Sequence, residues 1–192
     1  MTLAIADIWE EWKRLTRFLE CSKIAFKRES DIWRSLQVPD LDAVRIATTN
    51  GDSSFSLTAN DHLDTLQDEG LLYFIVLTYS YSLCECYAKV KMGLGEGDRL
   101  SGGIETWGTN LLAQAGNNWT DVLHGRAGLI EVAIARNFIA HGTRLVGQST
   151  LNRYILAGEP CPWQFGQPLV LDYEKVELYR SRLKSLMRLG NS

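Results

Sequence analysis

The chain has 192 residues, of which 45% are hydrophobic, 22% charged and 10% aromatic. This composition excludes disordered, collagen-like and low-complexity chains, and the length fits one domain spanning residues 1–192. The formal net charge of −3 gives no sign of a nucleic-acid or membrane-surface partner. Residues 120–192 nevertheless carry nine basic and six acidic side chains, a modest positive bias that could favour a phosphate-bearing ligand.

The cysteines and the first residues bear on the location of the protein. The chain has four cysteines, Cys21, Cys84, Cys86 and Cys161. They are too few and too scattered for a disulfide framework, so we expect reduced core thiols. Residues 1–7 lack the basic start and apolar run of a secretory signal. Polar and charged residues interrupt the most apolar stretch, Leu71–Met92, which favours a buried helix over a membrane span. We therefore expect a cytoplasmic protein.

The first third of the chain predicts a long helix and a hairpin. Between Thr2 and Leu36 there is no glycine or proline, and large apolar residues recur at helical spacing. This stripe consists of Ile8, Trp12, Leu15, Leu19 and Phe26. Pro39 ends the region, and residues 43–57 then place Asn50-Gly51 between two short β-prone runs, which is typical of a tight hairpin.

The middle of the chain predicts two helices and a loop. A short helix is expected from Asn60 to Glu69, and Gly70 separates it from a mostly apolar, central helix over Leu71–Met92. Residues 93–103 contain five glycines and predict a flexible loop.

The last third predicts further helices. Helical patterns cover residues 104–115 and 120–146, and turn residues at 158, 160 and 162 precede a short β-prone run at 168–171. Asp172 is expected to cap a closing helix, whose stripe consists of Val176, Tyr179, Leu183 and Leu186. The chain as a whole predicts an all-α helical bundle with minor β-hairpin and short-strand excursions.

The segment 130–142 carries the clearest chemical signal. At about 100° per residue, one sector of a helix contains four polar and two small residues, Arg136, Asn137, His141, Arg144, Ala133 and Ala140. One apolar stripe consists of Ile130, Ile134, Phe138 and Leu145, and Val132 and Ile139 point nearly opposite to it. Such a helix must be buried on two sides.

Polar groups on so buried a helix need partners. Arg136 and His141 are five residues apart, so their side chains would flank a pocket, where an imidazole could transfer protons and a guanidinium could stabilise phosphate charge. The alternative is structural: Arg136 and His141 would cap a helix end and pair with carboxylates.

The segment Arg136-Asn137-Phe138-Ile139-Ala140-His141 resembles the R-x4-6-H motif of HEPN domains, in which a polar residue, often Asn, follows the Arg. The sequence from Ala135 to Gly142 also resembles the RiboL-PSP and MAE-like branches of the same family. The Leu71–Met92 helix with Glu85, and a final helix after a β-prone run, are similar to the family's layout along most of the chain.

The resemblance implies a metal-independent endoribonuclease in which two protomers form one composite active site across a two-fold interface. Arg136 and His141 would be catalytic, and Asn137 would orient them. The RNA 2′-hydroxyl would attack the adjacent phosphorus and leave a 2′,3′-cyclic phosphate and a 5′-hydroxyl, with His141 transferring protons and Arg136 holding the phosphate oxygens. Some family toxins have a Tyr two residues after the His as a nucleotidylation site. Here Thr143 stands there instead, so regulation of that kind is not expected.

Three further residues are substrate-binding candidates. Glu85 stands alone in an apolar run and is expected to pair with Arg136 or His141. Arg144 shares the polar sector and could hold RNA phosphates, although a surface salt bridge fits equally well. His124 could line the same cleft or simply stand at a helix start. The histidine and cysteine spacing predicts no metal site, and no cofactor is expected.

The favoured hypothesis is therefore a homodimeric ribonuclease of a toxin or antiviral-defence type. Its substrate would be tRNA or mRNA in single-stranded or loop regions, where the 2′-hydroxyl can rotate into line. An antitoxin or regulatory protein is a possible partner, and no membrane partner is expected. Two alternatives stay open: a non-catalytic HEPN module that binds a nucleotide or a partner protein, and a structural bundle whose polar sector fixes dimer register.

Overall fold

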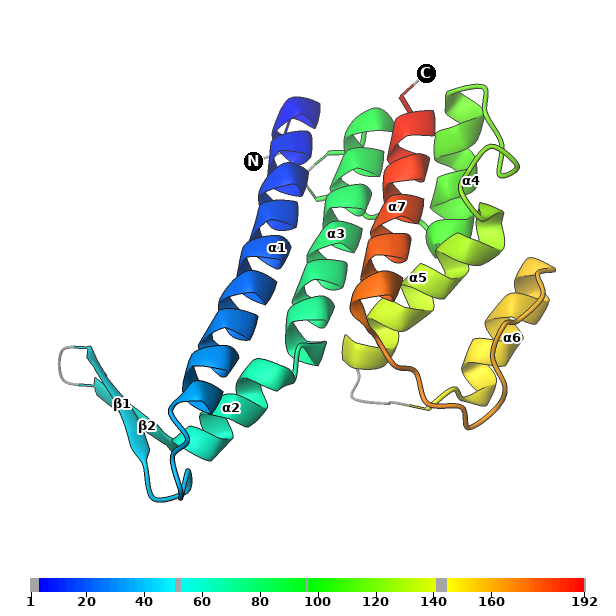
Figure 1. Ribbon diagram of the computed structural model, residues 1–192. Coiled ribbons are helices and arrows are strands. Elements are labelled where there is room, and N and C mark those ends of the chain that lie inside the picture. The colour runs from blue at the N-terminus through cyan, green and yellow to red at the C-terminus, as the bar shows by residue number, and fades with distance from the viewer. Residues whose placement is uncertain (1–3, 51–52, 96, 141–144, 192) are drawn as a thin grey trace. The chain divides into compact units, whose positions relative to one another are not determined.

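The structure is a computed structural model that describes residues 4–50, 53–95, 97–140 and 145–191. The expected mostly-α fold is confirmed, since the protein is 66% helical. The elements are α1 (Ile5–Ser35), β1 (Arg45–Asn50), β2 (Ser53–Thr58), α2 (Ala59–Gln67), α3 (Gly70–Lys91), α4 (Ile104–Gln114), α5 (Gly125–Ala140), α6 (Gln148–Ala157) and α7 (Tyr173–Leu189) (Figure 1).

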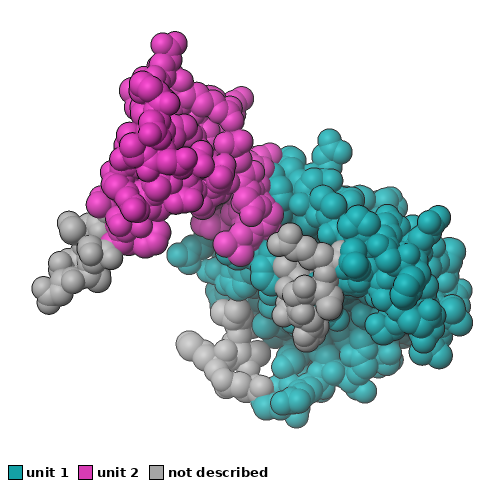
Figure 2. Space-filling model, turned by 90° about the horizontal axis from the view of Figure 1, so that it is seen from below, with its two compact units in different colours: residues 1–15, 73–192 teal, residues 16–72 magenta. Residues whose placement is uncertain are grey.

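The chain divides into two compact units, which Figure 2 shows in different colours. Unit 1 comprises residues 1–15 and 73–192, and unit 2 comprises residues 16–72. Helices α1 and α3 each contribute residues to both units.

Unit 2 contains the hairpin that the sequence predicts. Strands β1 and β2 pair antiparallel from Arg45 opposite Thr58 to Asn50 opposite Ser53. Thr58 also caps α2: its side chain accepts a hydrogen bond from the Asp61 amide, and the Asp61 carboxylate accepts one from the Thr58 amide. This reciprocal pair satisfies amides that the helix itself leaves free, so the strand passes directly into α2.

Unit 1 is built around one main hydrophobic core. The core draws residues from the start of α1 and from α3, α4, α5 and α7, and its largest fully buried members include Tyr87, Trp107 and Tyr179. Asp172 caps α7 by accepting a hydrogen bond from the Lys175 amide, as predicted. The predicted stripe of α7 is buried in this core at Val176, Tyr179, Leu183 and Leu186.

Helix α3 is the central helix expected from its apolar sequence. Among the described helices it is the one long and apolar enough to cross a membrane, but 56% of its most apolar stretch is buried inside the protein. Such packing is typical of the core helix of a soluble protein.

Helix α5 is buried on two sides, as its sequence pattern predicts. Leu129, Val132, Ala133 and Ala135 belong to the main core. Ile130, Ile134 and Phe138 belong to a second cluster, together with Val146 and with Tyr154 of α6. The two apolar faces leave a narrow sector of α5 for polar side chains.

Helix α5 is shorter than the predicted helix over residues 120–146. Its first residue is Gly125, and the positive φ values of His124 (62°) and Gly125 (60°) show that the chain turns there and that a right-handed helix cannot extend back through residues 120–124. At the other end, Leu145 lies in an extended bridge with Pro168 rather than in a helix. The β-prone run at 168–171 therefore gives a single bridge instead of a strand.

The sequence did not predict α6. The helix has only ten residues, and the buried ones, Thr150 and Tyr154, include just one large apolar side chain, so its apolar pattern is too short to recognise. Gly158 ends α6 in the left-handed region, with φ 68°, as a helix C-cap glycine commonly does.

The prediction that the cysteines are core thiols is wrong for most of them. All four thiols are free. Only Cys84 is buried, whereas Cys21 and Cys86 are exposed and Cys161 is partly buried. Cys21 on α1 and Cys86 on α3 lie on exposed positions of long helices, where a small side chain needs no burial.

Candidate functional site

The last turns of α5 carry Arg136 and Asn137, both partly buried. Arg136 Nη1 donates a hydrogen bond to Asn137 Oδ1 over 2.8 Å. The guanidinium also lies over the ring of Tyr81 on α3, with Cζ 5.3 Å from the ring centroid. These two contacts fix the orientation of the guanidinium, since a cation is attracted to the face of an aromatic ring.

The charge of Arg136 is not neutralised by a direct ion pair within the described ranges. Three other arginines of unit 1 each contact a carboxylate: Arg126 with Glu159, Arg153 with Glu105 and Arg182 with Glu131. Arg136 differs, and its buried Nε has no hydrogen-bond partner among the residues described. A buried donor without a partner costs about 1–3 kcal/mol. Arg136 therefore keeps a positive charge that no direct ion pair among the described residues neutralises.

Glu85 lies on α3, one helical turn after Tyr81, and faces the same region. Burial raises the pKa of the Glu85 carboxyl above its ordinary value, and the positive charges of Arg136 and Lys89 offset part of that rise. Glu85 and Arg136 therefore interact electrostatically, but no ion pair within 4 Å joins them, so the expected direct pairing is not seen with Arg136. His141, the other expected partner, lies outside the described residues.

Tyr81 is a further member of this cluster. Burial raises the pKa of its hydroxyl far above the ordinary value, and the charge of Glu85 raises it further. Arg153 and Arg136 act in the opposite direction. The phenol therefore stays protonated at neutral pH and can serve as a hydrogen-bond donor beside the two arginines.

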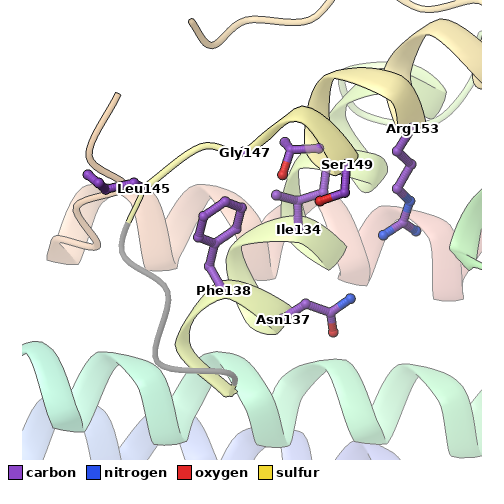
Figure 3. A pocket seen from close by; sticks show the side chains of 8 residues that line it. Ile134, Asn137, Phe138, Leu145, Gly147, Ser149 and Arg153 are labelled. Atoms are coloured by element: carbon purple, nitrogen blue, oxygen red, sulfur yellow. The ribbon is translucent and has the colours of Figure 1, made fainter. Parts of the chain in front are cut away.

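A pocket of about 320 Å³ opens beside Asn137, between α5 and α6. Figure 3 shows Ile134, Asn137 and Phe138 reaching it from α5 and Arg153 from α6. Arg153 is held there by a two-point ion pair with Glu105 of α4, with distances of 3.0 and 2.6 Å. Burial raises the pKa of Glu105, but its hydrogen bonds to Arg153 outweigh burial and hold that pKa below the ordinary value.

The structure brings together Arg136, Asn137 and Glu85 among the predicted site residues. His141 and Arg144 lie outside the described residues. His124 stands at the opposite end of α5, about 18 Å from Arg136 at 1.5 Å per residue. It is exposed, and its Nδ1 accepts a hydrogen bond from Arg182 Nε over 3.0 Å. His124 therefore belongs to a helix start and not to the Arg136 cluster.

Sequence reasoning missed Tyr81 and Arg153. Tyr81 could have been found, since it precedes Glu85 by four residues and must share its face of α3. Arg153 could not be placed without α6. In the described ranges, no group of three or more His, Cys, Asp or Glu side chains is arranged to hold a metal ion.

A second polar network, separate from the Arg136 cluster, joins α5 to α7. Glu131 accepts hydrogen bonds from Tyr179 at 2.8 Å and from Arg182 at 2.5 Å, and Arg182 also donates to the Gly128 carbonyl at 3.1 Å. The Arg182 side chain is 7% exposed. Because every member is paired, this network orients α7 on α5 and leaves no free group for a ligand.

Comparison with known proteins gave no match: no protein-family model, curated protein or solved structure matches the chain.

Proposed function

We propose that the chain is a metal-independent endoribonuclease of the toxin or defence type that acts as a cytoplasmic homodimer. The observation that carries the proposal is the state of Arg136. This guanidinium is held in place by Asn137 and Tyr81, yet it keeps a buried, unpaired Nε and contacts no carboxylate within the described ranges. A preorganised cation that no carboxylate neutralises is suited to a phosphate.

The proposed chemistry uses Arg136 on α5 and His141, which follows five residues later in the sequence. The 2′-oxygen of a ribose bonds to the adjacent phosphorus, the bond from phosphorus to the 5′-oxygen breaks, and a 2′,3′-cyclic phosphate and a 5′-hydroxyl result. His141 takes the proton from the 2′-hydroxyl or gives one to the leaving 5′-oxygen. Arg136 binds the non-bridging oxygens, whose negative charge grows during attack.

Asn137 and Glu85 have supporting roles in this proposal. Asn137 positions Arg136 through their 2.8 Å hydrogen bond. Glu85 places negative charge near the guanidinium without pairing with it, so the guanidinium stays available to RNA. The motif of a second protomer would complete the site across a two-fold axis, and an antitoxin or regulatory protein would control access to it.

The test is cleavage of a mixed tRNA and mRNA pool by purified protein in excess EDTA. Wild type is expected to cleave, whereas Arg136→Met and His141→Ala are expected to be inactive while remaining folded. Arg188→Met is the matched control, because Arg188 is exposed on α7 and outside the cluster. Intact RNA after incubation with folded, dimeric wild type would instead favour the non-catalytic binding module.

A further inference from the structure

The pocket between α5 and α6 combines a flat apolar wall with a polar edge. Ile134, Phe138 and Leu145 supply the wall, and Asn137, Ser149 and Arg153 supply polar groups. Its volume of about 320 Å³ lies at the lower end of the range typical of small-molecule sites, roughly 300–1,000 Å³. It is suited to a planar ligand the size of a nucleobase, which aromatic side chains commonly contact in RNA recognition.

The hydrogen bonds already made by Asn137 and Arg153 decide what the polar edge offers. Asn137 Oδ1 is occupied by Arg136 Nη1, so its amide nitrogen remains as a donor. Arg153 uses Nε and Nη2 for Glu105, so Nη1 remains as a donor. Figure 3 shows the Asn137 amide nitrogen on the side that faces Arg153. Two donors, one from each helix, therefore lie on the same side of the pocket.

A ligand that matches two neighbouring donors must present two neighbouring acceptors. Guanine does so with O6 and N7 and cytosine does so with N3 and O2, whereas adenine presents an amino donor beside N7. Of these two bases, the larger guanine covers more of the apolar wall formed by Ile134, Phe138 and Leu145. We propose that this pocket binds a guanine base of the RNA substrate. Because Asn137 directly follows Arg136, the bound guanine would belong to a nucleotide beside the cleaved phosphate. That position rests on the proposed nuclease function, but the binding of guanine does not.

Two substitutions fill the pocket without strain. Gly147 lines it with φ −99°, which any residue can adopt, and an added Cβ would meet only Ser149 Oγ, at 4.0 Å. Ser149 lines the pocket and is exposed. Gly147→Phe and Ser149→Trp should therefore fold and block the pocket. Gln148→Trp is the matched control, because Gln148 is the exposed neighbour that does not line it.

The experiment is calorimetric titration of the full chain with the 3′-monophosphates of guanosine, adenosine, cytidine and uridine, and with the 7-deaza analogue of the guanosine compound. Mononucleotides contain no bond to cleave, so the titration is independent of nuclease activity. We expect the guanosine compound to bind about tenfold more tightly than the other three. The 7-deaza analogue, which lacks one acceptor, should bind about tenfold more weakly than the guanosine compound, as expected for the loss of one hydrogen bond. Gly147→Phe and Ser149→Trp should abolish binding, and Gln148→Trp should keep it.

Three results would overturn the inference: no binding of any mononucleotide to wild type, equal binding of all four, or unchanged binding in the two filled variants. The two proposals fail separately. Guanosine binding by a protein that leaves RNA intact would support the pocket and reject the nuclease. Cleavage without base preference would support the nuclease and reject the pocket.

Discussion

Replacement by methionine should leave the stability nearly unchanged at Arg136 and lower it strongly at Arg182. For Arg136→Met, the losses are one hydrogen bond, worth about 1 kcal/mol, and a cation–π contact, worth about 0.5–1 kcal/mol. The gain is removal of the unpaired buried Nε, worth about 1–3 kcal/mol. The free energy of unfolding should therefore change by no more than about 1.5 kcal/mol in either direction, while RNA cleavage falls about 10²–10³-fold.

Arg182→Met should instead lower the free energy of unfolding. Arg182 is 7% exposed and ion-paired, and its loss leaves Glu131 without its cation. Breaking a buried pair in this way costs about 3–5 kcal/mol. Urea denaturation followed by circular dichroism measures both variants, and 3 kcal/mol corresponds to a midpoint shift of about 1.5 M at a slope of about 2 kcal/mol/M. An Arg136→Met variant as unstable as Arg182→Met would refute the reasoning, because Arg136 would then be a structural residue.

Three further predictions concern the surroundings of the site. The pKa of Glu85 is higher in the folded protein than its ordinary value of 4.5. The contribution of Glu85 to stability is therefore complete below pH 4.5 and is lost as pH rises through the pKa of the folded state. In urea titrations at several pH values, Glu85→Gln should therefore gain stability relative to wild type as pH rises from 4 to 7; a constant difference would contradict this. Glu105 has a lowered pKa, so its contribution is present above 4.5 and is lost as pH falls through the lower folded value. Glu105→Gln should cost on the order of 2 kcal/mol at pH 7, and the same titrations should show this cost shrinking in acid. Gly108→Ala should lower the thermal midpoint by overpacking, at about 1–3 kcal/mol, because its Cβ would lie 2.7 Å from the Trp119 ring; an unchanged midpoint would show that the ring can move.

The fold was largely predictable because long amphipathic helices repeat their apolar residues many times. The stripes of α1 and α7 and the two apolar faces of α5 follow from spacing alone, and Asn50-Gly51 marks the hairpin. Helix α6 was not predicted, because apolar residues recur too few times within ten residues to distinguish a helix from a loop. The start of α5 was predicted five residues too early, because nothing in the sequence shows that His124 adopts a left-handed backbone conformation.

The candidate site was predictable where its residues share one helix, and for Glu85, which stands out as the single carboxylate in the apolar run of α3. Arg136 and Asn137 are neighbours in sequence, and their joint placement follows from the α5 pattern. The position of Arg153 beside the pocket depends on how α6 packs against α5 and on the ion pair of Arg153 with Glu105 of α4. Sequence spacing carries no information on contacts between three separate helices, so the pocket and its donors required the structure.

The most direct test of the central claim is the mass of the products from a short single-stranded RNA cleaved in excess EDTA. The account predicts 2′,3′-cyclic phosphate and 5′-hydroxyl ends, and no cleavage where the ribose that supplies the attacking oxygen is replaced by its 2′-deoxy form. Products with 5′-phosphate and 3′-hydroxyl ends, or cleavage that continues at the 2′-deoxy position, would contradict it, because the attacking oxygen would then not be the 2′-hydroxyl.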